Sequence, residues 1–181
     1  IKLVGTDIDG VWTDARMYYS AEGDIMKSFS TYDGMGVQLL RDAEIPIIIM
    51  TSENTEIVSM RAQKLGINRI YQGENQKLKR LQEVCKELDI SLNEVAYIGD
   101  DINDLDVLQA VGLSAMPPNS PILDRFSPDY LTNRSGGDGA FRDFVDFMLL
   151  LHSTDGPAES FGVLIVRAGR SLFVYRSPVR S

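Results

Sequence analysis

The sequence predicts an α/β fold: a Rossmann-like, mainly parallel sheet with helices on both faces and a small β-hairpin inserted after the first strand. Short apolar runs alternate with segments of helical periodicity, as in successive βαβ units. The run at residues 45–50 is apolar throughout, which is typical of a parallel strand covered on both faces. Polar residues follow three of the expected strands, where sheets of this kind bind their ligands.

Length and composition limit the class of protein. A chain of 181 residues is long enough for one domain with its own hydrophobic core. Its 18 Lys and Arg against 26 Asp and Glu leave a formal charge of −8, which argues against nucleic acid as a partner. No apolar run reaches the roughly 18 residues that a membrane-spanning helix requires, so we expect no membrane association.

Two rare residue types exclude further classes. Cys85 is the only cysteine, so the chain can form no internal disulfide, and a reducing, cytoplasmic location is expected. His152 is the only histidine, which excludes His-rich zinc sites and Ser-His-Asp catalysis. The chain begins with Ile1 rather than Met, so the sequence leaves open whether a removed leader precedes it.

The first part of the chain predicts a strand, a hairpin and a helix. Residues 2–8 form a short apolar strand that ends in Asp-Ile-Asp-Gly. Residues 15–20 and 25–30 are two β-prone runs around a turn that contains Gly23, which indicates a hairpin. Asp33 is expected to cap the helix that follows.

Strands and helices then alternate. After the strand at 45–50, apolar residues at helical spacing predict helices at 54–65 and 77–88, and Gly66 closes the first of them. The remaining expected elements are strands at 95–98 and 113–115 and helices at 104–110 and 139–151.

Residues 1–151 are expected to form a single domain, in which the hairpin insertion occupies about residues 14–32. The composition changes after Leu151, so residues 152–181 are treated as a C-terminal extension. Two apolar runs in the extension flank Ala-Gly-Arg, which suggests a second hairpin. Three roles stay open for the extension: a surface element, a subunit contact, or a source of arginines for a neighbour's substrate.

Asp7 and Asp9 are the first candidates for chemistry. Side chains two positions apart on a strand point to the same side, so these carboxylates repel each other unless a cation lies between them. Oxygen ligands without His or Cys select a hard ion, most simply Mg²⁺. The alternative is a pair of exposed loop aspartates, and for an isolated Asp-x-Asp that interpretation is the simpler one.

The wider set of polar motifs outweighs this alternative. In chain order the motifs are Asp7-Ile-Asp9, Thr51 after an apolar strand, Lys77, and Gly99-Asp100-Asp101 with Asp104. Alone, Thr51 is explained as a helix cap, Lys77 as a solvated helix residue, and Asp100 as the start of a helix. In combination, the motifs resemble those of the haloacid-dehalogenase-type phosphatases.

The resemblance implies a mechanism with an aspartyl-phosphate intermediate. Asp7 would attack phosphorus, and Asp9 would protonate the leaving sugar oxygen and then activate water. An attacking carboxylate is repelled by the phosphate dianion, by about 4 kcal/mol per pair of unit charges at about 4 Å and an effective dielectric near 20. Mg²⁺ and the Lys77 ammonium would cancel this repulsion.

The resemblance also implies which residues hold the ligands. Three aspartates would bind the ion: Asp7, Asp100 and, through its main-chain carbonyl, Asp9. The phosphate would be bound by Thr51, Ser52 and Lys77. Asp101 and Asp104 would orient the ion or the lysine.

Within the superfamily, the chain looks like the phosphatases of 2-keto-3-deoxy sugar acids, which act on 3-deoxy-D-manno-octulosonate 8-phosphate or keto-deoxy-nononate 9-phosphate. The matching segments are 7–14, 71–77, 95–101, 111–114 and 136–142. In that family the enzymes are homotetramers whose hairpins assemble, and neighbours complete each active site. Asp33 would serve a neighbour's substrate in this way. Products of such enzymes feed surface-polysaccharide precursors, as in lipopolysaccharide or sialic acid biosynthesis.

One motif departs from the octulosonate pattern. Those enzymes usually carry Thr-Gly-Arg where this chain has Thr51-Ser52-Glu53, which reverses a charge beside the substrate. Glu53 with Lys64 instead resembles the nine-carbon branch, with a carboxylate for sugar hydroxyls and a lysine for the substrate carboxylate. The alternative is that Glu53 caps the helix and Lys64 is solvated, so eight- and nine-carbon substrates both stay open.

Two rival interpretations fit the chain less well. Phospho-acceptor receiver domains also use acidic residues, Thr and Lys, but their lysine comes last, whereas Lys77 precedes the second acidic cluster. A catalytically silent assembly module, associated with a sugar-acid cytidylyltransferase, would have lost acidic residues that this chain keeps.

Overall fold

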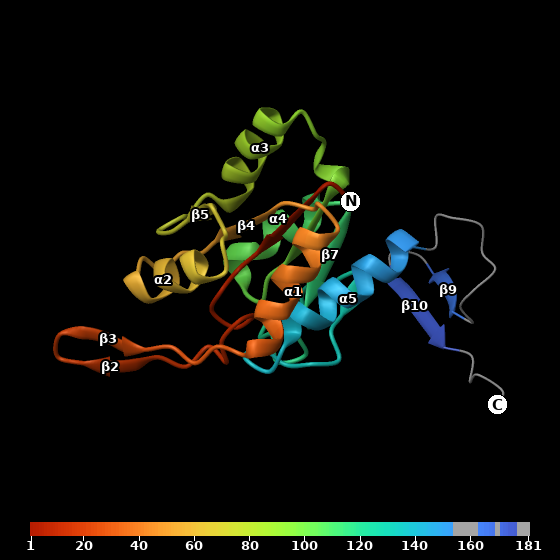
Figure 1. The fold of residues 1–181 in the computed structure, drawn as a ribbon. Coiled ribbons are helices and arrows are strands. Elements are labelled where there is room, and N and C mark those ends of the chain that lie inside the picture. The colour runs from red at the N-terminus through yellow and green to blue at the C-terminus, as the bar shows by residue number, and fades with distance from the viewer. Residues whose placement is uncertain (154–162, 169–170, 177–181) are drawn as a thin grey trace.

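The computed structural model describes residues 1–153, 163–168 and 171–176. Its centre is a six-stranded sheet in the order β5-β4-β1-β6-β7-β8, in which all neighbouring strands are parallel (Figure 1). In chain order these strands are β1 (Leu3–Thr6), β4 (Ile47–Met50), β5 (Arg69–Tyr71), β6 (Val95–Ile98), β7 (Leu113–Met116) and β8 (Tyr130–Leu131). The predicted fold class is therefore confirmed.

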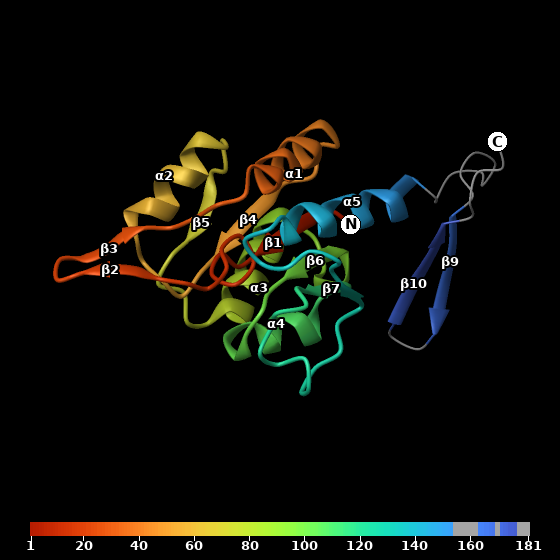
Figure 2. The same ribbon diagram turned by 90° about the horizontal axis from the view of Figure 1, so that it is seen from below.

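Helices cover both faces of this sheet (Figures 1 and 2). One face packs against α1 (Thr31–Asp42), α2 (Glu56–Lys64) and α5 (Ala140–Ser153), the other against α3 (Lys77–Leu88) and α4 (Leu105–Ala110). Consecutive strand residues enter opposite cores: Ile49 lies in the first and Ile48 in the second. Because side chains alternate along a strand, a strand covered on both faces has to be apolar throughout, as the residues of β4 are.

The inserted hairpin consists of β2 (Tyr18–Ser20) and β3 (Gly23–Met26), which pair antiparallel as a separate sheet. Both strands are shorter than the predicted runs at 15–20 and 25–30. The hairpin projects away from the central sheet (Figure 1) and leaves large apolar side chains exposed: Met17, Tyr18, Tyr19, Ile25 and Met26.

Most other elements begin and end within two residues of the prediction, and the differences have local causes. Helix α1 starts at Thr31 because Ser30, rather than Asp33, is its N-cap and accepts the Tyr32 N–H. Helix α2 starts after Thr55, whose hydroxyl oxygen accepts the Ile57 N–H. The sequence pattern does not predict β5 and β8, because strands of 3 and 2 residues are too short to show a period.

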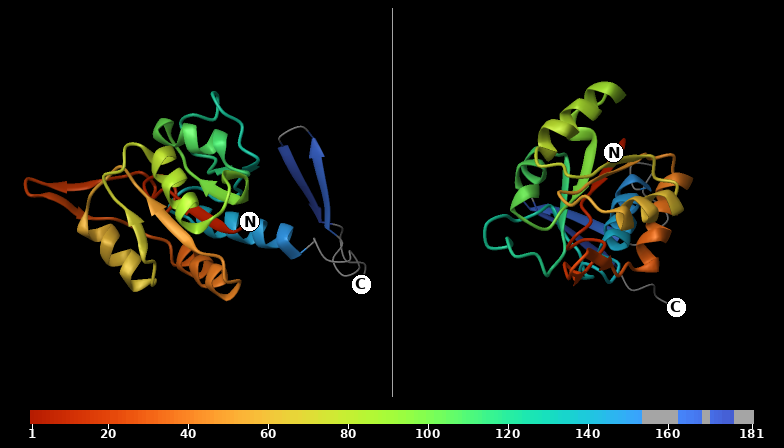
Figure 3. Two further views of the ribbon diagram at one scale, coloured as in Figure 1. Left: turned by 90° about the horizontal axis from the view of Figure 1, so that it is seen from above. Right: turned by 90° about the vertical axis from the view of Figure 1, so that its left-hand side faces the viewer.

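After α5, strands β9 (Val163–Ala168) and β10 (Ser171–Arg176) pair antiparallel in a sheet of their own (Figure 3). The second hairpin suggested by the sequence is therefore present, although its first predicted residue, Phe161, lies outside the described residues. Within the described ranges, no helix has the length and apolar character needed to cross a membrane.

Candidate active site

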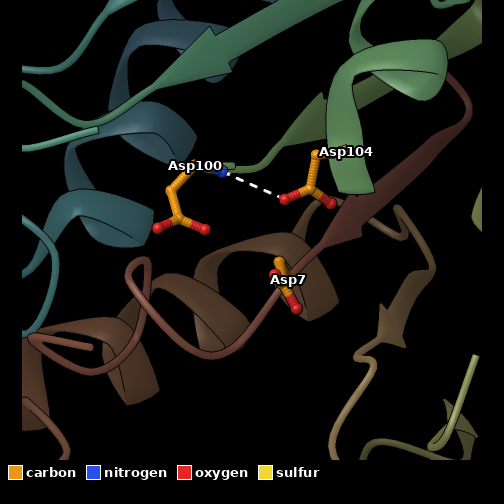
Figure 4. A group of neighbouring side chains, drawn as sticks. All are labelled: Asp7, Asp100 and Asp104. Atoms are coloured by element: carbon orange, nitrogen blue, oxygen red, sulfur yellow. Dashed lines mark hydrogen bonds between the residues drawn. The ribbon is translucent and has the colours of Figure 1, made fainter. Parts of the chain in front are cut away.

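The carboxyl ends of β1 and β6 bring three aspartates together. Asp7 follows β1 and Asp100 follows β6 within two residues, and the two strands pair in parallel with Thr6 opposite Ile98. Asp104 ends the short 3₁₀ helix that comes next. One carboxylate oxygen of each aspartate lies within 4.8 Å of the others, and all three residues are buried (Figure 4). The carboxylates of Asp7 and Asp100 are thus close enough to share one ion.

Lys77 reaches this cluster from the first position of α3. Its Nζ lies 3.0 Å from Asp7 Oδ2 and 2.7 Å from Asp104 Oδ1, and its side chain is 1% exposed. Burial alone would lower the pKa of Lys77, but the charges of Asp7 and Asp104 together raise it, so the ammonium stays charged. The amphipathic pattern of α3 turns this residue inward, since its helix face is otherwise apolar and buried: Leu81, Val84 and Cys85.

The pKa values of the clustered aspartates indicate an excess of negative charge. Burial and then the charge of Asp104 hold the pKa of Asp7 well above its usual range, while Lys77 opposes this shift. Burial, followed by the charges of Asp104 and Asp101, raises the pKa of Asp100 to about 7. One ammonium does not neutralise three buried carboxylates. A divalent cation would supply the missing positive charge, so these residues fit such an ion.

Asp104 acts on the cluster through other groups. Its Oδ1 accepts from Lys77 and, at 2.6 Å, from the hydroxyl of Tyr97. Its Oδ2 accepts the backbone N–H groups of Asp100 at 3.1 Å and Asp101 at 3.4 Å. Donors thus occupy both oxygens of Asp104, which joins the lysine to the turn after β6, and its part in an active site stays a prediction. The exposed carboxylate of Asp101 caps the 3₁₀ helix instead.

The turn after Asp9 packs directly against the acidic cluster. Gly10 has a φ of +85°, and a Cβ there would lie 1.8 Å from Asp100 Oδ2. Glycine is therefore needed both for the backbone conformation and for the close approach. The main-chain carbonyl of Asp9 directly precedes this glycine, and its part in holding an ion stays a prediction.

The Asp9 side chain pairs with a lysine that the motifs did not reveal. Its Oδ1 lies 2.5 Å from Nζ of Lys27 and 3.3 Å from Oγ1 of Thr13. Lys27 follows β3, and its side chain is 1% exposed. Among the described residues, Asp9 Oδ2 is buried without a hydrogen-bond partner. No local signal in the sequence separates Lys27 from an ordinary exposed hairpin lysine, so only the fold shows this contact.

Thr51 and Ser52 follow β4, next to β1 in the sheet. Thr51 is 1% exposed, and its Oγ1 accepts the Glu53 N–H at 3.3 Å. Ser52 Oγ accepts from Nδ2 of Asn103 at 2.9 Å, which links this edge to the 3₁₀ helix after β6. Both hydroxyl groups border the same sheet edge as Asp7, and their contact with a phosphate stays a prediction.

Glu53 and Lys64 lie at opposite ends of α2, and their contact with a substrate stays a prediction. Both side chains are exposed, but Glu53 precedes α2 and Lys64 ends it. The 9 residues of α2 at about 1.5 Å each give the helix a length of roughly 13 Å. A helix that follows a parallel strand runs back from the ligand-binding edge, which carries Lys64 away from Asp7. Glu53 does not cap the helix either, because Thr55 does.

Asp33 is buried within its own chain, in contrast to its predicted contact with a neighbour's substrate. Its Oδ1 accepts the backbone N–H of Arg142 at 2.9 Å, which joins the first turns of α1 and α5. Its Oδ2 is buried and unpartnered among the described residues. Burial raises the pKa of Asp33 to about 7, although the Arg142 N–H and the Arg61 charge oppose the shift. The carboxylate thus fastens two helices to each other.

We expect Asp33→Asn to make folding stability less dependent on pH. Because the folded-state pKa lies above the ordinary 3.8, the stability due to neutral Asp33 is complete below about pH 4 and is lost as the pH rises through about 7. Asparagine keeps an oxygen for the Arg142 N–H and cannot ionise. The variant should therefore gain on the wild type by up to about 1.4 kcal/mol per pH unit across this window. Urea unfolding of both proteins measures the gap, and parallel pH curves would contradict the prediction.

Sequence comparisons place the chain among known enzymes. The haloacid dehalogenase-like hydrolase family matches residues 40–121. The 3-deoxy-D-manno-octulosonate 8-phosphate phosphatase of Haemophilus influenzae is 36% identical over 149 residues, which cover 82% of this chain and 83% of that protein. The phosphatase of the same name from Escherichia coli K12 is 35% identical over 150 residues, covering 83% and 80%.

Solved structures agree with this placement. The 3-deoxy-D-manno-octulosonate 8-phosphate phosphatase of Moraxella catarrhalis, crystallised with magnesium, phosphate and KDO, superposes with a TM-score of 0.80 at 37% identity, over 85% of this chain and 88% of that one. The cobalt-bound enzyme of Haemophilus influenzae gives 0.80 at 33% identity, over 88% and 94%. The predicted superfamily is confirmed, and the paired Lys77 and Asp7 lie where its motifs meet. This chain belongs to the 3-deoxy-D-manno-octulosonate 8-phosphate phosphatase family, whose members are phosphoric monoester hydrolases of the haloacid dehalogenase-like type.

Proposed function

We propose that this chain is a Mg²⁺-dependent phosphatase that releases phosphate from 3-deoxy-D-manno-octulosonate 8-phosphate. One observation carries the proposal: a buried ammonium, that of Lys77, lies 3.0 Å from the carboxylate of Asp7, within a cluster of three acidic groups. This arrangement presents a nucleophile and positive charge to a phosphate monoester. The substrate follows from the relatives of that name, which the chain matches over four-fifths of its length.

The chain's own residues supply nucleophile, acid and base. Asp7 is held by the Ile8 N–H at 2.8 Å on Oδ1 and by Lys77 on Oδ2. As its oxygen bonds to phosphorus, the ester P–O bond breaks and the sugar oxygen takes a proton from Asp9. Asp9 then deprotonates a water, which hydrolyses the aspartyl-phosphate and restores Asp7. The Lys77 ammonium and the Thr51 hydroxyl stabilise the charge on the transferring group.

The donor set suits Mg²⁺. Asp7 and Asp100 offer carboxylate oxygens within reach of each other, and the turn at Asp9 offers a main-chain carbonyl. Such oxygen ligands select a hard cation. When bound, the ion supplies positive charge that offsets the negative charge of the phosphate and of the aspartates.

We expect Mg²⁺ to bind more weakly at about pH 6 than at about pH 8. Asp100, whose pKa is raised to about 7, and Asp7, whose pKa is raised as well, take up protons as the pH falls, and these protons compete with the ion. For each proton that binding releases, the apparent affinity for Mg²⁺ falls by up to about tenfold when the pH is lowered by one unit. The measurement is the Mg²⁺ dependence of the urea midpoint at both pH values. Equal affinities would contradict a site made from these two groups.

The substrate is tested by comparing kcat/KM for the eight-carbon and nine-carbon sugar-acid phosphates with Mg²⁺. We expect turnover of 3-deoxy-D-manno-octulosonate 8-phosphate, with a release of inorganic phosphate that depends on the ion. No turnover of this compound by folded protein with bound Mg²⁺ would contradict the proposed function. Turnover of the nine-carbon compound alone would correct its substrate.

We expect Glu53→Arg to raise the preference for the eight-carbon over the nine-carbon substrate by about tenfold, or roughly 1.4 kcal/mol. Glu53 is exposed directly after Thr51 and Ser52, where a carboxylate favours hydroxyl donors and an arginine favours a substrate carboxylate. The matched control is Glu56→Arg, the same exchange at an exposed position in the first turn of α2. An unchanged ratio of kcat/KM would show that Glu53 does not select the substrate.

We also infer self-association through the hairpin, as a homotetramer in keeping with the family resemblance. The described residues include no large cap domain, and the hairpin leaves Tyr19 and Ile25 each 61% exposed. A contiguous patch of exposed apolar side chains is more often an interaction surface than a surface left in contact with water. Light scattering on the purified protein tests the assembly.

We infer that residues 1–151 are the phosphatase domain, since all the site residues lie within them. A free buried thiol at Cys85 supports the cytoplasm as the location of the protein.

A catalytically silent assembly module is less well supported. Burying the Lys77–Asp7 pair and two further carboxylates costs desolvation free energy, and apolar residues of similar volume would stabilise such a core at least as well. Retention of the charged cluster therefore favours the enzyme.

A further inference from the structure

The hairpin is joined to the active site by one buried ion pair. Lys27, one position after β3, is the hairpin's buried charged residue, and its Nζ lies 2.5 Å from Asp9 Oδ1. The apolar side chains of β2 and β3 are exposed, so the lysine points inward where its neighbours point to the surface. A buried ammonium loses its hydration and is tolerated where a carboxylate compensates it.

This contact and a second hydrogen bond hold one oxygen of the Asp9 carboxyl group. Oδ1 is occupied by the Lys27 ammonium and by the Thr13 hydroxyl at 3.3 Å. Oδ2 is buried, and no described residue bonds to it. A carboxyl group held at one oxygen has its second oxygen fixed in direction, because the group is planar and its rotation is blocked. The contact with Lys27 therefore fixes the orientation of the whole Asp9 carboxyl group, whose side chain is 26% exposed.

We propose that Lys27 is a positioning residue, which holds the Asp9 carboxyl group in the orientation from which it protonates the oxygen of the leaving group. The inference rests on the proposed function, in which Asp9 is the acid and base. Lys27 makes no bond to phosphorus. The proton passes from Asp9 to the ester oxygen as the P–O bond to the leaving group breaks and the bond to Asp7 forms. The lysine's contribution is the geometry of that transfer.

Such a role predicts a dependence on the leaving group. A sugar alkoxide is strongly basic and departs only with a proton, whereas p-nitrophenolate is weakly basic and departs without one. Phenolate lies between them and has nearly the same size as p-nitrophenolate. If Lys27 positions the acid, its loss should harm the three substrates in the order of their basicity.

The test compares kcat/KM of the wild type and Lys27→Met in the presence of Mg²⁺. The three substrates are p-nitrophenyl phosphate, phenyl phosphate and 3-deoxy-D-manno-octulosonate 8-phosphate. The ratio kcat/KM reports the first irreversible step, which is the one with the departing group. We expect a loss of about a hundredfold on the sugar-acid phosphate, less on phenyl phosphate, and below about threefold on p-nitrophenyl phosphate.

Two further variants separate positioning from simple support of the fold. Lys27→Arg keeps the charge and should recover most of the lost kcat/KM on the sugar-acid phosphate. Arg16→Met removes another cation of the hairpin region, one that is 78% exposed and 3.6 Å from Asp14, and should leave all three values unaltered. Methionine nearly matches the length of lysine, and thermal unfolding checks that Lys27→Met stays folded.

Equal losses on all three substrates, or no loss at all, would overturn the positioning role of Lys27. Failure of the proposed function looks different. If the wild type hydrolysed both aryl phosphates and left the sugar-acid phosphate intact, the substrate would be wrong, while the two aryl compounds would still decide the role of Lys27. If the wild type hydrolysed none of the three, both proposals would be wrong.

Discussion

Asp7→Asn is expected to lower kcat on the eight-carbon sugar-acid phosphate at least about a thousandfold while the chain stays folded. The asparagine oxygen carries no full negative charge, so it does not attack phosphorus. It still accepts the Ile8 N–H that Asp7 Oδ1 accepts at 2.8 Å. The exchange also removes one of three clustered carboxylates, so the free energy of unfolding should change by no more than about 2 kcal/mol.

The measurement is the steady-state release of inorganic phosphate, together with acid quenching of the enzyme during turnover of labelled substrate. The wild type should retain label on the protein and Asp7→Asn should retain none. Asp106→Asn is the matched control, because it makes the same exchange at an exposed position of α4. Activity of Asp7→Asn within about tenfold of the wild type would refute the assigned nucleophile.

Lys77→Met is expected to lower kcat/KM at least about a hundredfold and to destabilise the Mg²⁺-free protein by about 3–5 kcal/mol near neutral pH. The ammonium pairs with Asp7 at 3.0 Å and with Asp104 at 2.7 Å, both buried. Methionine occupies a similar volume, so the loss is electrostatic and leaves no large cavity. It should shrink at acidic pH, where the raised pKa values of Asp7 and Asp100 leave these groups neutral.

Urea unfolding with and without Mg²⁺ distinguishes the two effects of this variant. The ion compensates the same carboxylates, so it should restore part of the stability of Lys77→Met but not its activity. Lys79→Met, at an exposed position of the same helix, is the control and should change neither quantity. Wild-type activity in Lys77→Met would show that the lysine serves the fold alone.

The acidic cluster could be predicted from the sequence because its positions are set locally. Asp7 and Asp100 each follow a short apolar strand, and parallel strands end at the same edge of a sheet. The predicted bounds of α3 are those observed, since its buried positions repeat at helical spacing from Lys77 onward. Neither inference requires knowledge of how distant segments pack.

The contacts that the sequence did not reveal all join segments through side chains. Lys27 meets Asp9 across 18 positions, and Asn103 meets Ser52 across 51. Tyr97 has the pattern of an ordinary core residue of β6, yet its hydroxyl donates to Asp104. The same limit explains Asp33, whose acidic side chain at the start of a helix indicated a cap or a ligand and instead bonds to Arg142 across 109 positions.

The sequence by itself determined the parallel sheet, the edge at which its polar residues gather and the superfamily, and it singled out the aspartates and the lysine that the structure brings together. The tertiary structure decided which oxygen faces which cation: Lys77 bridges Asp7 and Asp104, and Lys27 binds one oxygen of Asp9. Apolar periodicity and strand ends are properties of neighbouring residues, whereas a pairing at 3 Å depends on how whole elements pack, which no local pattern encodes.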